Sequence, residues 1–200
     1  MPTFLHAGCG AKRKKQTTVG FNSPDWTEVR LDIDESVHPD IVGTMTDMAA
    51  VSDASVDAVY SSHTIEHLYP HEVSIALKEF LRVLRPDGFL VITCPDLQSV
   101  AQLIVDDKLT EAAYTSPAGP IAAIDILYGH RPHLARGKLH MAHHCGFTRK
   151  VLGAVLQASG FRGIALKSRA APKFDLWAVA SKSARTKEQI QALAIRHFPG

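Results

Sequence analysis

The sequence of 200 residues has few cysteines, and they lie far apart. Cys9, Cys94 and Cys145 include no C-x-x-C pair, so the common spacings of zinc sites and dithiol redox sites are absent. A scattered, odd-numbered set of cysteines is typical of a reducing compartment, where disulfides are rare. We therefore expect a cytoplasmic protein.

The sequence also lacks long apolar runs and a strong excess of one charge. No stretch approaches the roughly 20 apolar residues that a membrane helix needs, and residues 1–9 carry no basic leader of an export signal. The net charge is only +2, whereas proteins that bind nucleic acids usually carry a strong basic excess on one face. We expect neither a membrane nor a nucleic-acid partner, and composition predicts no oligomeric state.

The sequence does contain enough apolar residues for one sizeable core. Its hydrophobic content is 46%, and a chain of this length that formed two separate cores would have each near the lower size limit. We therefore expect a single domain over residues 1–200.

Short apolar runs bounded by Asp, Pro, Gly and Ser predict strands in the first half of the chain. They span residues 3–7, 28–32, 40–43 and 56–60, and we expect the last three to be central strands. Apolar residues at helical spacing predict a helix over residues 73–84, and an unbroken apolar strand at 89–93 follows. This order predicts an α/β fold in which strands and helices alternate throughout.

Residues 115–147 interrupt this alternation. Prolines and glycines break regular structure there, and five of the eleven histidines fall between His130 and His144. We interpret the segment as a lid or acceptor-site insertion. Beyond it, we expect a helix at 151–156 that stops at Gly160, strands near 164–167 and 176–180, and a C-terminal helix within residues 184–200 that begins at a capping box of Thr186 and Gln189.

A glycine-rich turn, Gly8-Cys9-Gly10, follows the first predicted strand. In doubly wound sheets such a turn lets a nucleotide approach the backbone at the carboxyl ends of the strands, although a tight turn alone also favours glycine. Asp32 ends the second predicted strand, 22 residues after Gly10, where dinucleotide-type sites place a carboxylate that binds the ribose. Arg13 replaces the third glycine of the dinucleotide fingerprint. This replacement favours S-adenosylmethionine (SAM), which has a ribose but no pyrophosphate, over NAD.

At these motifs the sequence resembles the class I SAM-dependent methyltransferases, specifically small bacterial proteins with a methyltransferase domain. The similarity covers roughly residues 3–100. It rests on the segments Leu5-His6-Ala7-Gly8-Cys9-Gly10, Leu31-Asp32-Ile33-Asp34, 55–63, Glu66-His67-Leu68 and 82–88.

The resemblance implies a Rossmann-like, doubly wound sheet of seven strands, with the last strand antiparallel and SAM lying across the strand ends. It implies that Asp32 holds the ribose and that the loop at 44–48 frames the adenine, with Asp47 at its amine. The segment 61–63 falls where the methionine portion of SAM meets the acceptor. The cofactor-binding residues that we predict are His6, Ala7, Gly8, Gly10, Asp32, Ile33, Thr46, Asp47, Met48, Ser61 and Ser62.

Some features depart from the family pattern. His6 occupies a position where relatives often have an acid that helps bind the methionine end of SAM, and Thr44 stands where many relatives have Asp. The chain also lacks the usual helix before the first strand. We therefore expect one flank of the cofactor to be unusually open.

Methyl transfer from a sulfonium is an in-line displacement, so positioning of the acceptor supplies much of the catalysis. For a hydroxyl acceptor, an imidazole with an unperturbed pKa of about 6.5 suits a general base, and His63 is the best placed. We also predict catalytic roles for Asp96, after the fifth strand, and for His143 in the lid. An acid such as Asp96 fits a helix N-terminus equally well.

The histidine-rich segment at residues 140–148 has three interpretations: an acceptor pocket or lid, a purely structural element, or a metal site. Imidazole and thiolate are metal ligands, but the spacing matches no zinc template, and we predict no metal. Tyr128 and His143 are our candidates for contact with the acceptor. Glu66 and His67 either face the cleft or have capping and orienting roles.

The basic run at residues 12–15 lies next to the glycine turn, and it either grips an acidic acceptor or forms a solvated loop. We predict a SAM-dependent methyltransferase that acts on a small-molecule or glycan-like acceptor. The alternatives are a non-catalytic SAM-binding relative and another Rossmann nucleotide-binding protein, such as an NAD-dependent oxidoreductase.

Overall fold

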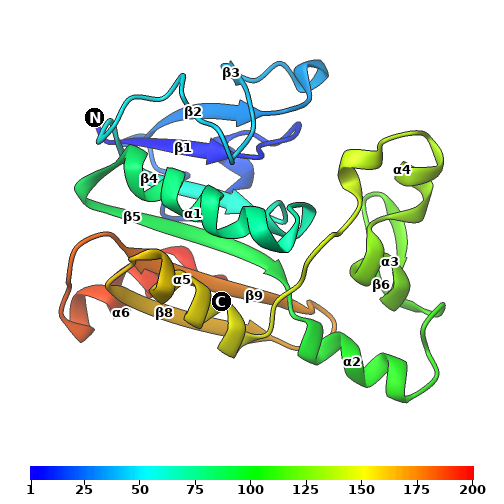
Figure 1. Ribbon diagram of the computed structural model, residues 1–200. Coiled ribbons are helices and arrows are strands. Elements are labelled where there is room, and N and C mark those ends of the chain that lie inside the picture. Colours follow the sequence, from blue (N-terminus) through cyan, green and yellow to red (C-terminus); the bar gives the residue numbers. More distant parts are fainter.

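The computed structural model, which describes residues 1–200, is built around a seven-stranded sheet in the order β3-β2-β1-β4-β5-β9-β8 (Figure 1). β9 runs antiparallel to its neighbours β5 and β8, whereas the other pairs of neighbours are parallel. The predicted α/β fold with an antiparallel last strand is thus confirmed. The strands are β1 (Thr3–Ala7), β2 (Thr27–Asp32), β3 (Ile41–Val42), β4 (Val56–Ser62), β5 (Leu84–Pro95), β8 (Gly163–Arg169) and β9 (Asp175–Ser181).

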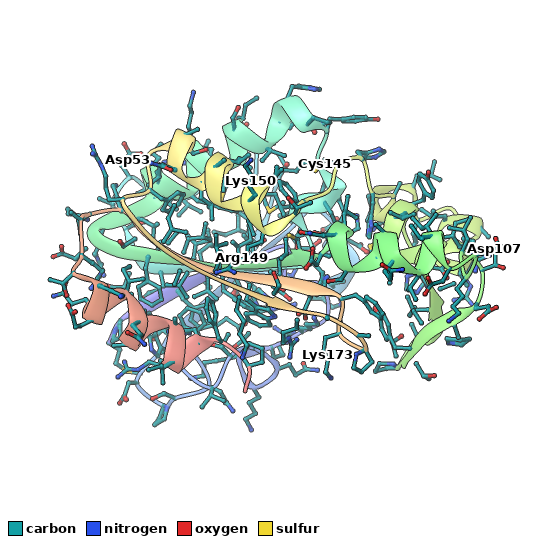
Figure 2. The ribbon with its side chains drawn as sticks, turned by 90° about the horizontal axis from the view of Figure 1, so that it is seen from below. Asp53, Asp107, Cys145, Arg149, Lys150 and Lys173 are labelled. Carbon is teal, nitrogen blue, oxygen red and sulfur yellow. The ribbon has the colours of Figure 1, made fainter.

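Side chains alternate between the two faces of the sheet, as the period of a strand requires. In β1, Leu5 and Ala7 join the core under α1 (Pro70–Val83) and α5 (Arg149–Ser159). Phe4, one residue earlier, packs on the opposite face, which α6 (Lys187–His197) covers. Figure 2 shows α1 and α5 on one side of the sheet and α6 on the other.

The C-terminal helix begins at its predicted capping box. The Thr186 hydroxyl accepts a hydrogen bond of 3.3 Å from the backbone N–H of Gln189, whose side chain accepts one of 2.9 Å from the N–H of Thr186. These bonds satisfy two N–H groups that the first turn of a helix otherwise leaves without partners. The helix that begins here packs against β8 and β9.

The expected alternation of strands and helices is wrong for the first half of the chain. Between β1 and β4 there are only two short 3-10 turns, η1 (Lys14–Gln16) and η2 (Glu35–Val37). The loop after β1 instead inserts Phe21, which stacks on Phe4 with ring centroids 4.4 Å apart and on Phe89 at 6.0 Å. Aromatic side chains thus bury the sheet surface that a crossover helix would cover.

The run at residues 40–43 is not a central strand, as we had expected. Only Ile41 and Val42 form β3, which pairs with β2 alone at the edge of the sheet. The Val42 side chain is 57% exposed because no further strand or helix covers this edge.

Short regular elements occupy the segment in which we expected prolines and glycines to break regular structure. After α2 (Leu97–Val105), the chain forms a hairpin of β6 (Ala112–Ser116) and β7 (Gly119–Ala122), then α3 (Ala123–Tyr128), α4 (Arg131–Ala135) and η4 (Leu139–Met141). Several of the predicted breakers lie at the junctions: Gly119 and Gly129 have positive φ angles beside the hairpin and after α3. This lobe has a small apolar cluster of its own and stands beyond the carboxyl ends of β1 and β5 (Figure 1).

The helices can be compared with the length and apolar character that a membrane span requires. None of them is both long and apolar enough to span a bilayer.

Candidate active site

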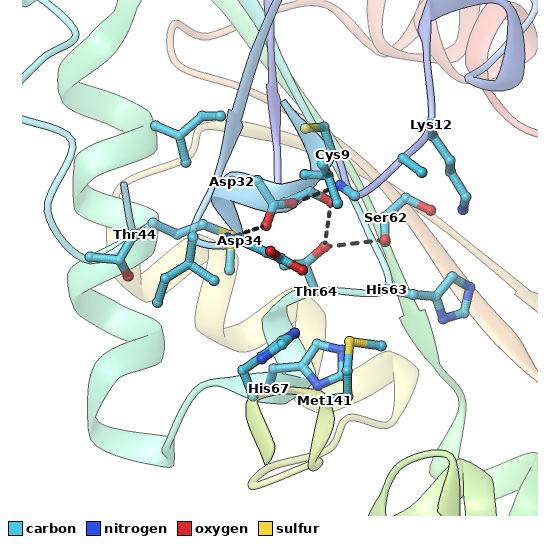
Figure 3. Close-up of a pocket in the computed structure, with 18 of the residues that line it drawn as sticks. Cys9, Lys12, Asp32, Asp34, Thr44, Ser62, His63, Thr64, His67 and Met141 are labelled. Atoms are coloured by element: carbon cyan, nitrogen blue, oxygen red, sulfur yellow. Dashed lines mark hydrogen bonds between the residues drawn. The ribbon is translucent and has the colours of Figure 1, made fainter. Parts of the chain in front are cut away.

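A cavity of about 620 Å³ lies at the carboxyl ends of the parallel strands. The turns that follow β1, β2, β3 and β4 form its walls, and the lobe closes it with His133, Lys138, His140 and Met141. Its volume is within the range of small-ligand sites, roughly 300–1,000 Å³. Figure 3 shows Asp32 and Asp34 on one side of the cavity, and Lys12 and His63 on the other.

The two glycines of the turn after β1 have different structural roles. Both have left-handed backbone angles, with φ of +68° at Gly8 and +50° at Gly10, a region in which glycine has no steric cost. A Cβ on Gly8 would lie 2.1 Å from the side chain of Thr64, whereas a Cβ on Gly10 would meet no atom within 4 Å. Gly8 therefore permits close packing of two turns, and Gly10 leaves space at the wall of the cavity.

Asp32 ties this turn to the end of β2. Its Oδ2 accepts a hydrogen bond of 2.6 Å from the N–H of Gly10, and its Oδ1 accepts one of 2.9 Å from the N–H of Asp34. A carboxylate has about four acceptor positions, so two bonds leave capacity for a ligand. Because Asp32 also lines the cavity, a hydroxyl-bearing ligand can meet it there.

Arg30 is a structural residue of the site that we did not identify from the sequence. Its side chain is only 2% exposed, and its guanidinium donates to the carbonyl oxygens of Gly10 and His38, both at 2.6 Å, and of Lys12 at 3.2 Å. It thereby joins the turn after β1 to the loop after β2. The signal in the sequence was an arginine between Val29 and Leu31 in a predicted strand, because a charge that is buried there requires partners.

His63 stands at the end of β4 in a left-handed conformation, with φ of +52°. Such a conformation is uncommon outside glycine and is frequent at functional sites. The backbone N–H of His63 donates to the carbonyl of Thr93 at 2.9 Å, and the side chain is 44% exposed and lines the cavity. Its Nδ1 lies 3.5 Å from Oε1 of Glu66.

The electrostatics on this side of the cavity centre on the buried Glu66, in η3 (Ile65–His67). Burial raises the pKa of Glu66, but the imidazoles of His63, His67 and His143 lower it, and the net shift is downward. Burial lowers the pKa of the Lys12 ammonium, and the charge of Glu66 partly offsets that effect. Burial also raises the pKa of Cys9 to about 11, so this thiol stays protonated and unreactive at neutral pH.

The structure brings some of the predicted cofactor residues to the cavity and leaves others outside it. Gly8, Gly10, Asp32, Ile33 and Ser62 line it, and Ala7 and Ser61 are fully buried within strands. His6 does not line the cavity. Its side chain lies on the face of the sheet that carries Phe4, where its Nδ1 is 2.8 Å from Oε1 of Glu28. In the loop after β3, where we expected adenine contacts from Thr46, Asp47 and Met48, the residues that line the cavity are instead Gly43, Thr44 and Met45.

Of the three predicted catalytic residues, only His63 lines the cavity. Asp96 is buried as the N-cap of α2, where it accepts from the N–H of Gln98 at 3.1 Å and from the hydroxyl of Ser99 at 3.0 Å. His143 lies behind the cavity wall with its Nδ1 2.8 Å from the carbonyl of Ile126. Tyr128 also lies outside the lining and is largely exposed.

The sequence matches a family model described as "Methyltransferase domain" over residues 5–92. That match runs from β1 into β5 and so includes every strand that ends at the cavity. The strand order and the antiparallel β9 complete the same fold in the rest of the chain. Over residues 5–92, somewhat less than half of the chain, the sequence is thus similar to this methyltransferase family, and the whole chain has the matching Rossmann-like fold. This similarity indicates SAM as the cofactor and methyl transfer as the class of reaction.

Solved structures with the same fold are distant in sequence. A SAM-dependent methyltransferase from Thermotoga maritima is 15% identical, with a TM-score of 0.57 over 92% of this chain and 83% of its own. The 1,6-didemethyltoxoflavin-N1-methyltransferase of Burkholderia thailandensis, solved with 1,6-didemethyltoxoflavin and S-adenosylhomocysteine, is 16% identical, with a TM-score of 0.58 over 91% and 72%. A SAM-dependent methyltransferase from Methanosarcina mazei is 16% identical, with a TM-score of 0.59 over 92% and 93%. No curated protein matches the sequence.

Proposed function

We propose that this methyltransferase transfers a methyl group from SAM to a small-molecule acceptor that binds between the strand ends and the lobe. One observation carries the proposal: His133, Lys138, His140 and Met141 of the lobe line the same cavity as the glycine turn. The lobe thus shields part of a cavity that is otherwise open to solvent. The limited space between the lobe and the strand ends favours a small acceptor.

The residues of the cavity fit SAM at three points. The open space beside Gly10 allows close approach of a ligand to the backbone, and Asp32 has free acceptor capacity for the ribose hydroxyls. The adenine would lie against Gly43, Thr44 and Met45, which line the wall near the edge strand. This assignment keeps the adenine loop that the sequence predicts but shifts the contacts toward its first residues.

SAM supplies a methyl group on a positively charged sulfur. A lone pair of the acceptor forms the new bond to the methyl carbon while the carbon–sulfur bond breaks and its electrons pass to sulfur, which leaves S-adenosylhomocysteine. An acceptor O–H or N–H also loses its proton. We propose that His63, at the end of β4, contacts this acceptor, and its role as general base stays a prediction.

The charges of the lobe indicate a polar, negatively charged acceptor. Lys138 and two histidines face the cavity from the lobe, and Lys12 faces it from the turn after β1. The Nζ of Lys138 lies 3.9 Å from Oδ2 of Asp34, so the lobe and the loop after β2 approach each other across the opening. A phosphorylated or carboxylated small molecule, including a sugar derivative, matches these cations.

The proposal is tested by incubating the protein with methyl-labelled SAM and separate pools of small metabolites, glycans and nucleic acids. We expect label in the small-molecule pool together with release of S-adenosylhomocysteine. With the acceptor identified, Lys138→Ala should raise its KM, whereas Lys108→Ala, on an exposed part of the same lobe, should not. Label that enters only macromolecules would contradict the proposal.

A further inference from the structure

The Glu66 carboxylate is buried without the partners that a buried charge requires. Its side chain is 1% exposed, and neither Oε1 nor Oε2 has a hydrogen-bond partner. The approach of His63 to Oε1, at 3.5 Å, is too long for a strong hydrogen bond. Buried carboxylates in folded proteins are paired, hydrogen-bonded or bound to a metal ion, so the two oxygens of Glu66 are available to ligate a cation.

Two imidazoles near Glu66 are held in the tautomer of a metal ligand. The Nδ1 of His67 lies 3.0 Å from the carbonyl oxygen of Ala142, and the Nδ1 of His143 lies 2.8 Å from that of Ile126. Because a carbonyl only accepts, each Nδ1 carries the proton and donates it, and the Nε2 of the neutral ring keeps its lone pair. Metal-bound histidines are usually oriented by this type of second hydrogen bond.

The three side chains converge although they are distant in the sequence. Each side chain offers one possible ligand atom, and these three atoms, from Glu66, His67 and His143, lie within 4.8 Å of one another. The backbone holds this arrangement, since the N–H groups of His144 and Cys145 donate to the carbonyl oxygen of Glu66 at 2.9 and 3.2 Å. The segment that returns from the lobe is therefore fixed against η3.

We infer that Glu66, His67 and His143 bind one divalent transition-metal ion. Two imidazoles and one carboxylate suit ions such as Zn²⁺, Co²⁺ or Mn²⁺, whereas Ca²⁺ and Mg²⁺ prefer sites made of oxygen atoms. His67 also lines the cavity, so the ion has protein ligands on one side and the acceptor space on the other. A site of three protein ligands keeps coordination positions open, as catalytic zinc sites do.

Cys145 is close to this site but is not one of its ligands. Its Sγ donates to the carbonyl oxygen of Ile65 at 3.4 Å, and the group of converging ligand atoms consists of Glu66, His67 and His143 without it. This ligand set also explains why the spacing within residues 140–148 matches no zinc template: only one ligand comes from that segment.

The inference is tested with Zn²⁺ on the full chain after removal of metal by a chelator. Calorimetric titration should show one equivalent of Zn²⁺ bound, and Co²⁺ should give visible absorption bands typical of coordination by nitrogen. Glu66→Gln and His143→Ala should each weaken Zn²⁺ binding by at least about tenfold, the lower limit for losing even a supporting residue. His144→Ala, the adjacent exposed histidine, should bind as the wild type does.

Two results would overturn the inference. One is a wild-type protein that binds no stoichiometric Zn²⁺, since this requires no variant to fold. The other is unchanged binding in both Glu66→Gln and His143→Ala, with folding verified by circular dichroism. Because these measurements use the ion alone, they do not depend on the proposed acceptor or on turnover.

Discussion

The guanidinium of Arg30 donates a hydrogen bond of 2.6 Å to the carbonyl oxygen of Gly10. The N–H of the same glycine donates to Asp32 at 2.6 Å, so residues from one strand hold both sides of its backbone. This arrangement fixes the left-handed turn before a ligand arrives. Preorganisation of this kind lowers the entropic cost of binding.

Arg30→Met should therefore destabilise the protein and weaken SAM binding together. The substitution removes the donor from several carbonyl oxygens around a buried side chain, and we expect a loss of roughly 2 to 4 kcal/mol in the free energy of unfolding. Denaturation in urea measures it. Arg85→Met is the matched control, because Arg85 is 48% exposed in its ion pair with Asp57 and should contribute no more than about 1 kcal/mol. Equal losses in the two variants would show that Arg30 has no special role.

Comparison of Gly10→Ala with Gly137→Ala distinguishes the cost of backbone strain, which lowers stability, from the loss of space for a ligand, which weakens SAM binding. Both glycines have positive φ, and a Cβ on either meets no atom within 4 Å, so each variant should lose roughly 1 to 2 kcal/mol of stability. Only Gly10 lines the cavity. Gly10→Ala should weaken SAM binding by at least about tenfold, or about 1.4 kcal/mol, and Gly137→Ala should not. Calorimetry with SAM would refute this assignment if both variants bound equally well.

His63→Ala should lower turnover and leave SAM affinity unchanged, because His63 lines the cavity where we propose that it contacts the acceptor. If His63 is the general base, the loss should be about 100-fold or more. Steady-state rates with the identified acceptor and calorimetry with SAM measure the two effects. His71→Ala, an exposed residue stacked on Tyr69, serves as the control. Turnover by His63→Ala equal to that of the wild type would show that His63 is not the general base.

His197 should make stability depend on pH. Burial, with a smaller effect of Arg196, lowers the pKa of His197 to about 4, whereas an unfolded histidine has a pKa of about 6.5. Between these values the unfolded chain binds more protons, so stability falls as the pH is lowered from about 6.5 to about 4. This residue alone should cost about 2 to 3 kcal/mol between pH 7 and pH 4.5.

His197→Phe tests this dependence, because it keeps a ring between Phe21 and Phe89 but removes the titrating group. The variant should show a smaller decrease in the free energy of unfolding over the same pH range. Parallel pH profiles for the wild type and the variant would contradict the prediction. The hydroxyl of Thr18, which lies 2.7 Å from Nδ1 of His197, loses its partner at every pH and shifts the whole curve.

Much of the fold was predictable because strand periodicity and turn glycines are local properties. Most strands of the main sheet and the positions of Gly10 and Asp32 follow from short segments, whereas the antiparallel β9 followed only from the resemblance to the family. The aromatic side chains that cover the sheet in place of a helix between β1 and β4 were not predictable in this way. Phe21 packs there because the fold brings it onto Phe4 and Phe89, which are its contacts in the folded chain.

The same distinction applies within the site. Residues inside a strand, such as His6 and Ser61, are buried on one face of the sheet or the other, whereas the residues that line the cavity lie at the last positions of the strands and in the turns beyond them. Only the folded lobe brings His143 beside Glu66. No pattern in the sequence encodes that contact.

The central claim is that SAM binds at the turn of Gly8 and Gly10 with its ribose on Asp32. Titration calorimetry of the wild type and Asp32→Ala with SAM and NAD tests it most directly. The account predicts one equivalent of SAM bound to the wild type, no binding of NAD, and an affinity for SAM that is weaker by roughly 1 to 3 kcal/mol in Asp32→Ala. Binding of NAD without SAM, or an unchanged affinity for SAM in Asp32→Ala, would contradict it.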